Sequence, residues 1–507
     1  MKPIVRSKGE TPSERYLATL ADHSFLELWS YPNTFIDKGI KNGGDGKELC
    51  DLLVVCGDDV IIFSDKSISW PESDNVELSW SRWYRRAVHK SVAQIRGAER
   101  WIRKFPDRIY LDPKCSNALP IALPPLDRIR IHGVAVALGA QNACSNHFED
   151  ADGSLMIVPS IIGEAHTDAQ APDRMPFAFG DVDPGGPFVH VFDETALNVV
   201  LREMDTISDF VEYLNERSST IRNKNLMVAP SEADLVATYL QTEDIDGNHH
   251  FPRPPQESHP DTFMYGVSSG TYREFIKDQQ YRLRREANKA SYAWDKLITT
   301  FTEHIMAGTS VEIAGELPTA ARAEPALRIM ARENRTVRRA LGEAILGAVK
   351  QSGQLPQDRF ARCIMPMNGF ADPECGYVFM TLAYPSHLDG KGGYEQYRKV
   401  RTAMLQTYCM SFLHDHRQMK RMVGIAMDKP NTGRRGSSED MVAVEITDWS
   451  PELEADVAKS RAQYEILQSS RLVKSNLSVQ EFPSVKSPLS RQQRRAAERS
   501  ARKAGKR

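Results

Sequence analysis

Four charged residues lie at the ends of two apolar runs near the N-terminus. The stretch GKELCDLLVVCGDDVIIFSDKS (46–67) carries Glu48 and Asp51 before the first run and Asp65 and Lys66 after the second. If the two runs pair as a hairpin around the GDD turn (57–59), these side chains meet at one edge of a sheet. Clustered carboxylates repel one another, and a divalent cation that prefers oxygen ligands, Mg²⁺ or Mn²⁺, relieves that repulsion.

A lysine beside such a cation suits one class of reaction. It can position or deprotonate a water molecule and stabilise negative charge on a phosphate. The residue types therefore predict metal-assisted phosphodiester hydrolysis, in which Lys66 acts on the attacking water and the scissile phosphate. The predicted metal ligands are Asp51, Asp65 and Glu48. The competing interpretation is that acids and a lysine at strand ends are solvated turn residues.

The elements around this stretch predict an α/β domain. A helix is indicated over residues 11–29, and the strands 51–56 and 60–67 follow it. Next come a long basic helix at about 80–104, strand candidates at 108–111, 128–138, 155–159 and 188–192, and an amphipathic helix at 193–217.

This arrangement resembles the PD-(D/E)XK nuclease superfamily, the fold of many restriction endonucleases. In that superfamily an acid starts the second core strand, an acid, any residue and a lysine end the third, and the next helix often carries a glutamine aimed at the site. By resemblance Asp51 matches the first acid and Lys66 the lysine. Gln94, in KSVAQIRGAERW, matches the glutamine and would orient the water or Lys66. An additional acid could be Glu48, or Glu14 on the first helix.

The resemblance covers about residues 10–140 and implies a restriction-endonuclease-like mixed sheet flanked by helices. One position departs from its pattern. The residue two before Lys66 should be acidic but is Ser64, and the acid is displaced to Asp65. Strand alternation puts Ser64 and Lys66 on one face and Asp65 on the other. Three explanations stay open: a bulge or strand end turns Asp65 inward, Glu48 supplies the missing carboxylate, or the site is degenerate.

Two basic segments indicate a polyanionic partner, although the net charge is only −2. Residues 81–104 hold eight Lys or Arg against one acid and are interleaved with Trp and Tyr, which favours contact with nucleic-acid phosphates. The residues expected to bind nucleic acid are Arg82, Arg85, Arg86, Lys90 and Arg96. The second segment, 491–507, is interpreted as a nucleic-acid arm, a ribosome-associated tail or a solubilising tail.

We expect four regions along the chain: a nuclease-like domain at 10–225 with its core at 10–140, a mainly helical region at 226–355, a small α/β domain at 356–475 and a basic, disordered tail at 476–507. The small α/β domain is indicated by strands at 362–367, 377–384, 422–428 and 441–449 and a helix at 392–415. The Pro-rich segment 244–261 reads as a long loop or an interdomain hinge. Its His249 and His250, with His259 nearby, could bind a metal, but the favoured interpretation is that they are exposed histidines.

Composition sets general limits. Apolar residues make up 41% and charged residues 26% of the chain, as in soluble globular proteins, and no apolar run approaches the roughly 20 residues of a membrane span. The N-terminus lacks the apolar core of a signal peptide, which favours the cytoplasm. Seven cysteines without a CxxC pair predict reduced, buried thiols.

Taken with the resemblance, these features predict a cytoplasmic, Mg²⁺- or Mn²⁺-dependent endonuclease that prefers DNA to RNA. A prokaryotic restriction or anti-phage defence role, with a homodimer or a defence-system partner protein, follows by analogy. The main alternative is a degenerate nuclease-like module that only binds nucleic acid or a partner protein.

Overall fold

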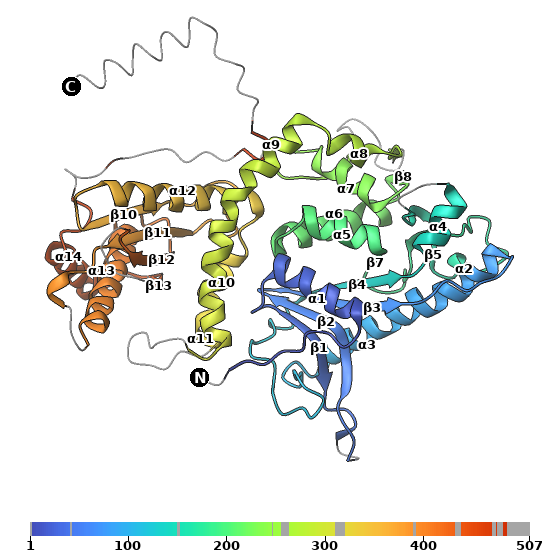
Figure 1. Cartoon of the computed structure of the whole chain (residues 1–507), viewed down its shortest axis with the longest axis horizontal. Helices are drawn as coiled ribbons and strands as arrows, with labels where there is room; N and C mark the ends of the chain where they lie inside the picture. Colours follow the sequence, from blue (N-terminus) through green and yellow to red (C-terminus); the bar gives the residue numbers. More distant parts are fainter. Residues whose placement is uncertain are drawn as a thin grey trace, which may run out of the picture.

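The structure is a computed structural model of the chain. It describes residues 3–40, 43–149, 153–245, 247–254, 263–309, 320–388, 392–430, 438–468, 473 and 480–483. Two main sheets lie at opposite ends of the molecule, and the helix α10 (Tyr292–Met306) runs between them (Figure 1).

Five strands form the N-terminal sheet. Their order across the sheet is β1 (Ser30–Ile36), β2 (Lys47–Cys56), β3 (Asp59–Ser67), β4 (Arg130–Leu138) and β7 (Val189–Phe192). The pairs β1–β2 and β2–β3 are antiparallel, whereas β3–β4 and β4–β7 are parallel. The apolar stretches of β2 and β3 are buried, so both faces of the sheet require cover. The predicted mixed α/β character is confirmed.

Helices supply this cover. On one face lie α1 (Pro12–Phe25), α5 (Glu194–Glu203) and α6 (Ile207–Arg222), where Phe63 of β3 packs against Phe25 and Phe210. On the other face lies α3 (Lys90–Lys104), which contacts β2, β3 and β4. It continues α2 (Val76–Tyr84) through a π-helical turn, Arg85–His89. The basic helix predicted at about 80–104 is therefore present, with a π turn inside it.

Three sequence expectations for this region differ from the structure. Residues 108–111 form no strand, because Tyr110 makes only isolated bridges to Phe35 and Ala118. The helix expected at 193–217 is two helices, since Thr206 caps the start of α6 through the N–H of Asp209. Strand β1 was not anticipated, because the YPN sequence at its start is typical of a turn.

Smaller elements complete the region. These are α4 (Gln141–Phe148) and two pairs of short parallel strands, β5 (Met156–Ile162) with β6 (Ala178–Asp181) and β8 (Leu226–Val228) with β9 (Tyr265–Gly266). Residues 232–354 are mainly helical, as predicted. Besides α10 they contain α7 (Glu232–Leu240), α8 (Thr271–Phe275), α9 (Gln279–Ala287), α11 (Ala320–Ala331) and α12 (Arg335–Gln354).

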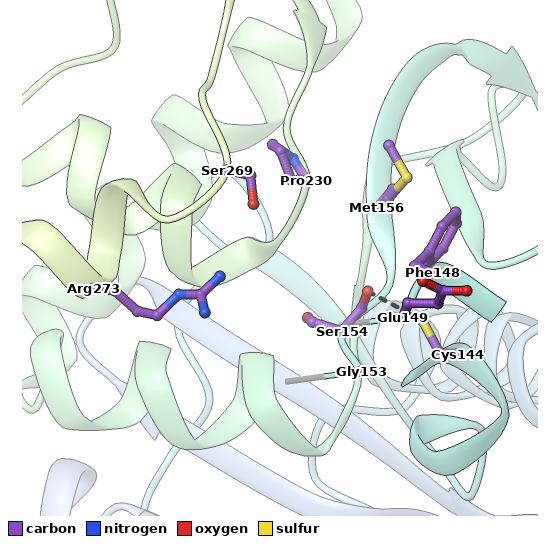
Figure 2. A pocket seen from close by; sticks show the side chains of 9 residues that line it. All are labelled: Cys144, Phe148, Glu149, Gly153, Ser154, Met156, Pro230, Ser269 and Arg273. Atoms are coloured by element: carbon purple, nitrogen blue, oxygen red, sulfur yellow. Dashed lines mark hydrogen bonds between the residues drawn. The ribbon is translucent and has the colours of Figure 1, made fainter. Parts of the chain in front are cut away.

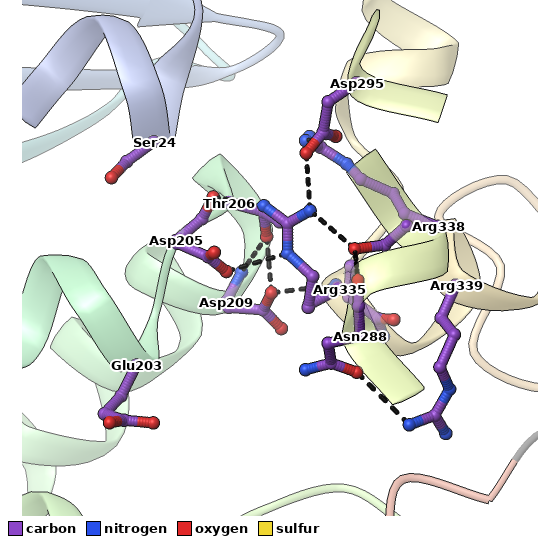
Figure 3. A network of polar contacts seen from close by, with 12 residues as sticks. Ser24, Glu203, Asp205, Thr206, Asp209, Asn288, Asp295, Arg335, Arg338 and Arg339 are labelled. Atoms are coloured by element: carbon purple, nitrogen blue, oxygen red, sulfur yellow. Dashed lines mark hydrogen bonds and ion pairs between the residues drawn. The ribbon is translucent and has the colours of Figure 1, made fainter. Parts of the chain in front are cut away.

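A buried ionic network joins this helical region to α6 (Figure 3). Arg335 donates to Asp205 at 2.8 Å and to Asp295 at 2.6 Å, and Arg338 donates to Asp295 at 2.8 Å. The helices also approach closely at Gly342, where a Cβ atom would lie 2.0 Å from the Ala290 carbonyl oxygen. Glycine is therefore required at this crossing.

The second sheet has the order β10 (Arg359–Ile364), β11 (Cys375–Leu382), β12 (Arg421–Asp428) and β13 (Glu439–Glu445). The parallel pair β11–β12 is connected by α13 (Gly393–Asp415), and α14 (Pro451–Gln463) follows β13. All four expected strands are present, with their ends shifted by a few residues. One cluster of buried apolar side chains extends from Leu17 to Ile425, so the two sheets share a continuous core. Residues 484–507, most of the predicted disordered tail, lie outside the described residues.

Candidate active site

The β2–β3 hairpin brings Asp51 and Lys66 together, as the sequence predicts. Strand β2 begins at Lys47, so Asp51 lies inside the strand and Glu48 is the acid near its start. The register pairs Leu52 with Phe63, which puts Asp51 beside the last residues of β3. Lys66 Nζ lies 3.1 Å from Asp51 Oδ2.

Asp51 is almost completely buried and fixes this edge of the sheet. Its Oδ2 atom accepts hydrogen bonds from Lys66 Nζ at 3.1 Å and from the backbone N–H of Asp65 at 2.6 Å. Lys66 also donates to the Asp65 carbonyl oxygen at 3.1 Å, and its side chain is 28% exposed. The pair therefore presents an anchored, solvent-accessible ammonium group.

Asp65 points away from this pair. Residues 59–67 pair with β4 without interruption, so regular alternation puts Asp65 on the face opposite Ser64 and Lys66. This register excludes the bulge that would turn Asp65 inward. Both carboxylate oxygens of Asp65 are buried, and neither accepts a hydrogen bond from the described part of the chain.

The electrostatic environment of Asp65 disfavours its charged form. Burial raises the pKa of the Asp65 carboxyl to about 6, the Ser13 hydroxyl opposes this shift, and the negative charges of Asp51 and Glu14 reinforce it. The Ser13 hydroxyl is near enough to oppose the shift but not within hydrogen-bond distance of the Asp65 carboxylate, and it contacts Thr11 Oγ1 at 3.2 Å. Asp65 is thus a buried acid without a hydrogen-bond partner in the described chain, and the positive charge of Lys66 offsets only part of the rise in its pKa.

Asn33 links two further acids on the α1 side of the sheet. Its Nδ2 group donates to Glu14 Oε2 at 2.9 Å and to Glu48 Oε1 at 3.0 Å, while Ser7 Oγ donates to Asn33 Oδ1 at 2.8 Å. The backbone of Asn33 is left-handed, with φ 47°, a conformation that asparagine adopts more readily than most residues. Sequence reasoning missed Asn33, because Pro32 and Asn33 suggested a turn.

The two bridged acids differ in their preferred charge state. Burial raises the pKa of Glu48, the hydrogen bond from Asn33 opposes this, and the charges of Asp51 and Glu14 reinforce it. Burial also disfavours ionised Glu14, but hydrogen bonds from Asn33 and from the N–H groups of Glu10 and Thr11 outweigh it and lower the Glu14 pKa. Glu14 is therefore an ionised cap at the start of α1, and Glu48 is the more easily protonated acid.

Gln94 of α3 reaches the face of the sheet that carries Ser64. Its Oε1 atom accepts a hydrogen bond from Ser64 Oγ at 2.9 Å. The position that should hold an acid by resemblance thus holds a neutral Ser64–Gln94 pair. No carboxylate is contributed to the Lys66 face from position 64.

The three predicted metal ligands do not converge into one preset site. Within the described ranges, only Glu243, His249 and Glu481 bring three ligand atoms within 4.8 Å of one another. Asp65 and Glu48 lie toward α1, whereas Asp51 contacts Lys66. The metal assignment of Asp51, Asp65 and Glu48 remains a prediction.

The five cations expected to bind nucleic acid fall into two groups. Arg82, Arg85, Arg86 and Lys90 are exposed and form no ion pair with the part of the chain that the structure describes. Arg96 is bound within the protein, to Asp183 at 2.5 Å and to Glu99 at 3.0 Å. The interleaved aromatic residues Trp80, Trp83 and Tyr84 are buried in the core and are not available to stack on bases.

A separate pocket of about 350 Å³ lies beside α4, which follows β4 in the chain (Figure 2). None of the predicted site residues lines it. The lining residues are Cys144, Phe148, Glu149, Gly153, Ser154, Met156, Pro230, Ser269 and Arg273.

Comparison with family models, curated proteins and solved structures finds no match to this chain. Among the residues described, no helix is both long and apolar enough to cross a membrane.

Proposed function

We propose that the chain is a metal-dependent phosphodiester hydrolase of PD-(D/E)XK type, centred on Asp51 and Lys66. The observation that carries the proposal is the Asp65 carboxylate, which is buried at the same strand end, on the face opposite that pair, and accepts no hydrogen bond within the described residues. An unpartnered buried charge is costly, and a bound cation would supply the missing partner. The resemblance favours DNA over RNA and a restriction or anti-phage role.

The position of the residues in the sheet supports the proposal. Strand β1 precedes the hairpin, so β2 is the second strand of the sheet along the chain and β3 is the third. Asp51 and Lys66 therefore lie on the strands that the resemblance requires, and Gln94 lies on the helix after them.

The acids present are compatible with Mg²⁺ or Mn²⁺. Mg²⁺ usually retains several waters and is held by only one or two carboxylates, so a preset group of three ligands is not required. Asp65 would hold the ion from the α1 side of the sheet, where Glu48 is a further acid, while Asp51 on the other face pairs with Lys66. When bound, Mg²⁺ would lower the pKa of a coordinated water and offset negative charge on the phosphate.

The side chains of the protein would supply the other functions that hydrolysis requires. Asp51 holds the Lys66 ammonium at 3.1 Å and keeps it directed at the sheet edge. Lys66 would stabilise a phosphate oxygen and orient the proton of the attacking water. The exposed cations of α2, the π turn and α3, namely Arg82, Arg85, Arg86 and Lys90, would contact backbone phosphates.

The second candidate function is a nuclease-like module that binds nucleic acid without cutting it. The Ser64–Gln94 hydrogen bond favours it, because a neutral pair replaces the acid on the Lys66 face. This candidate uses the exposed cations and requires no metal.

Cleavage assays separate the two functions. We would incubate supercoiled plasmid, linear DNA and RNA with the full chain in Mg²⁺, in Mn²⁺ and in EDTA. The hydrolase predicts metal-dependent cleavage that falls at least about 100-fold in Lys66→Ala and Asp51→Asn. Lys114→Ala, which removes an exposed lysine elsewhere, should cleave like the wild type. Binding without cleavage in every metal, unchanged in Lys66→Ala, would instead support the binding module.

A further inference from the structure

A short segment near the C-terminus docks against the helical region. Glu481 is the centre of this contact. Its Oε1 atom accepts a hydrogen bond from Arg284 Nε at 2.6 Å, and its Oε2 atom lies 2.9 Å from His249 Nε2. Arg339 donates to the Glu481 carbonyl oxygen at 3.1 Å and also to the Gln480 carbonyl oxygen. Side chain and backbone of the segment are both bound.

The next residue adds an aromatic contact. The ring of Phe482 lies edge-on to His249 at 6.4 Å and to Phe275 at 6.5 Å between centroids. The Arg284 guanidinium lies over the same ring at 5.6 Å, in cation–π geometry. Figure 1 shows the segment beside α9, the helix that carries Arg284. The surface therefore recognises an acidic residue followed by an aromatic one.

Residues outside the segment hold the recognising groups in place. Arg284 is only 4% exposed and also pairs with Glu203 at 3.3 Å. Glu203 in turn accepts hydrogen bonds from Tyr272 at 2.9 Å and Tyr281 at 2.8 Å. Arg339 is held by Asn288 Oδ1 at 3.2 Å (Figure 3). These contacts do not involve residues 480–483, so the surface is prepared independently of the segment.

The same cluster is poorly suited to a metal ion. Glu243, His249 and Glu481 bring their ligand atoms within 4.8 Å of one another. However, the Arg284 guanidinium already occupies Glu481 Oε1, and a cation beside it would be repelled. Ion pairing and aromatic packing account for the cluster without a metal.

We propose that residues 480–483 are an anchor peptide and that its receptor is formed by His249, Phe275, Arg284 and Arg339. The receptor is an acidic–aromatic peptide site that is filled by the chain's own C-terminal segment.

The anchor limits how far the basic residues 491–507 can extend from the helical region. An extended chain spans about 3.5 Å per residue, so residues 484–507 reach at most about 85 Å from the anchor, against about 135 Å from residue 468 without it. This inference does not depend on the proposed nuclease activity.

A peptide-binding experiment tests the anchor. In the full chain, Glu481→Ala with Phe482→Ala should empty the receptor and leave its four residues intact. A fluorescent peptide of residues 477–487 should then bind the double variant with at least tenfold higher affinity than it binds the wild type, whose receptor is filled. Adding Arg284→Ala to the double variant should abolish that gain, and so should alanine at both positions in the peptide.

Hydrogen exchange provides a second readout in the same proteins. The double variant should lose protection in α9 and around His249 while its circular dichroism stays near wild type, and the loss of an ionic partner of buried Arg284 should lower its thermal midpoint. A folded double variant that neither binds the peptide nor changes exchange there would overturn the anchor. Stoichiometric Zn²⁺ binding by the wild type that is lost in Glu243→Ala would overturn it in favour of a metal site. A wild-type dimer that dissociates in the double variant would overturn docking within one chain.

Discussion

The two sheets differ in whether their buried acidic residues have partners within the protein. At the end of β12 and the start of β13, Asp428 and Asp440 converge on Arg401, which is fully buried. Arg401 Nε donates to Asp440 at 2.7 Å, and Asp428 also accepts hydrogen bonds from Tyr394 at 2.8 Å and Tyr397 at 3.0 Å. Every acid of this cluster has a partner.

At the end of β3, by contrast, the partly exposed Lys66 forms an ion pair with Asp51, and the Asp65 carboxylate accepts no hydrogen bond within the described chain. Acidic residues at strand ends are thus not informative by themselves. A cluster whose charges are balanced within the protein is explained by stability alone. A cluster with an unmet charge is a candidate for binding a cation, and this difference separates the two sheets.

The largest effect should come from breaking the balanced cluster. Arg401→Met removes the cation paired with buried Asp428 and leaves Asp440 with Arg398 alone, and we expect a loss of about 3–5 kcal/mol in the free energy of unfolding. Urea unfolding would measure it. Lys399→Ala, on the same helix but exposed, should change stability by no more than about 0.5 kcal/mol. A loss below about 1 kcal/mol for Arg401→Met would contradict the comparison.

One substitution made in both sheets sharpens the contrast. In EDTA at pH 7, Asp65→Asn should stabilise the protein by about 3 kcal/mol, because it removes a buried charge whose pKa is raised to about 6. Asp428→Asn should destabilise it, because Arg401 loses part of its charge balance. Equal signs for the two substitutions would remove the distinction between the sheets.

The pH dependence of this effect has a definite sign. Between about pH 4 and pH 6 folded Asp65 keeps a proton that the unfolded chain releases, so wild-type stability falls relative to Asp65→Asn as pH rises through this range. The advantage of Asp65→Asn should vanish near pH 4. Above pH 6, Mg²⁺ should raise the thermal midpoint of the wild type and leave that of Asp65→Asn unchanged.

The smallest effect concerns cations with and without partners. Arg398 is paired with Asp440, whereas Arg82, Arg85 and Arg86 are exposed and form no ion pair within the described residues. Replacing each of these three by alanine should weaken nucleic-acid binding by about 1 kcal/mol and reduce the salt slope by about 1. Lys114→Ala is the matched surface control, and fluorescence anisotropy across a salt series measures both quantities. An unchanged slope would argue against a phosphate-binding role.

The sequence alone was sufficient to predict the features that depend on residues close together in the chain. The β2–β3 hairpin and the Asp51–Lys66 pair follow from two apolar runs and the turn between them. The alternation that separates Asp65 from Lys66 also follows from the strand period. These features can be predicted because the two strands of a hairpin are adjacent in the chain.

Features that join distant segments could not be predicted in this way. Arg96 reads as a free cation until Asp183, on another segment, is brought beside it. His249 was expected to be exposed, but Glu481 lies against it. Asn33 was missed because Pro32 and Asn33 suggested a turn, whereas the structure places both residues inside β1. In each case the missing information is tertiary packing, which propensities and periodicities do not contain.

The π turn at Arg85–His89 has a consequence for how the helix could change in evolution. A π turn corresponds to one residue inserted into a regular α-helix, and each residue of an α-helix advances by about 100°. The wider π turn takes up its extra residue with little added rotation, so the flanking helices keep nearly the relative direction of a regular helix one residue shorter. Deleting one residue here should therefore leave Arg82 and Gln94 on nearly the same sides of the helix, whereas one more inserted residue would rotate Arg82 by about 100° relative to Gln94. A single deletion is therefore expected to be tolerated better in this turn than a single insertion.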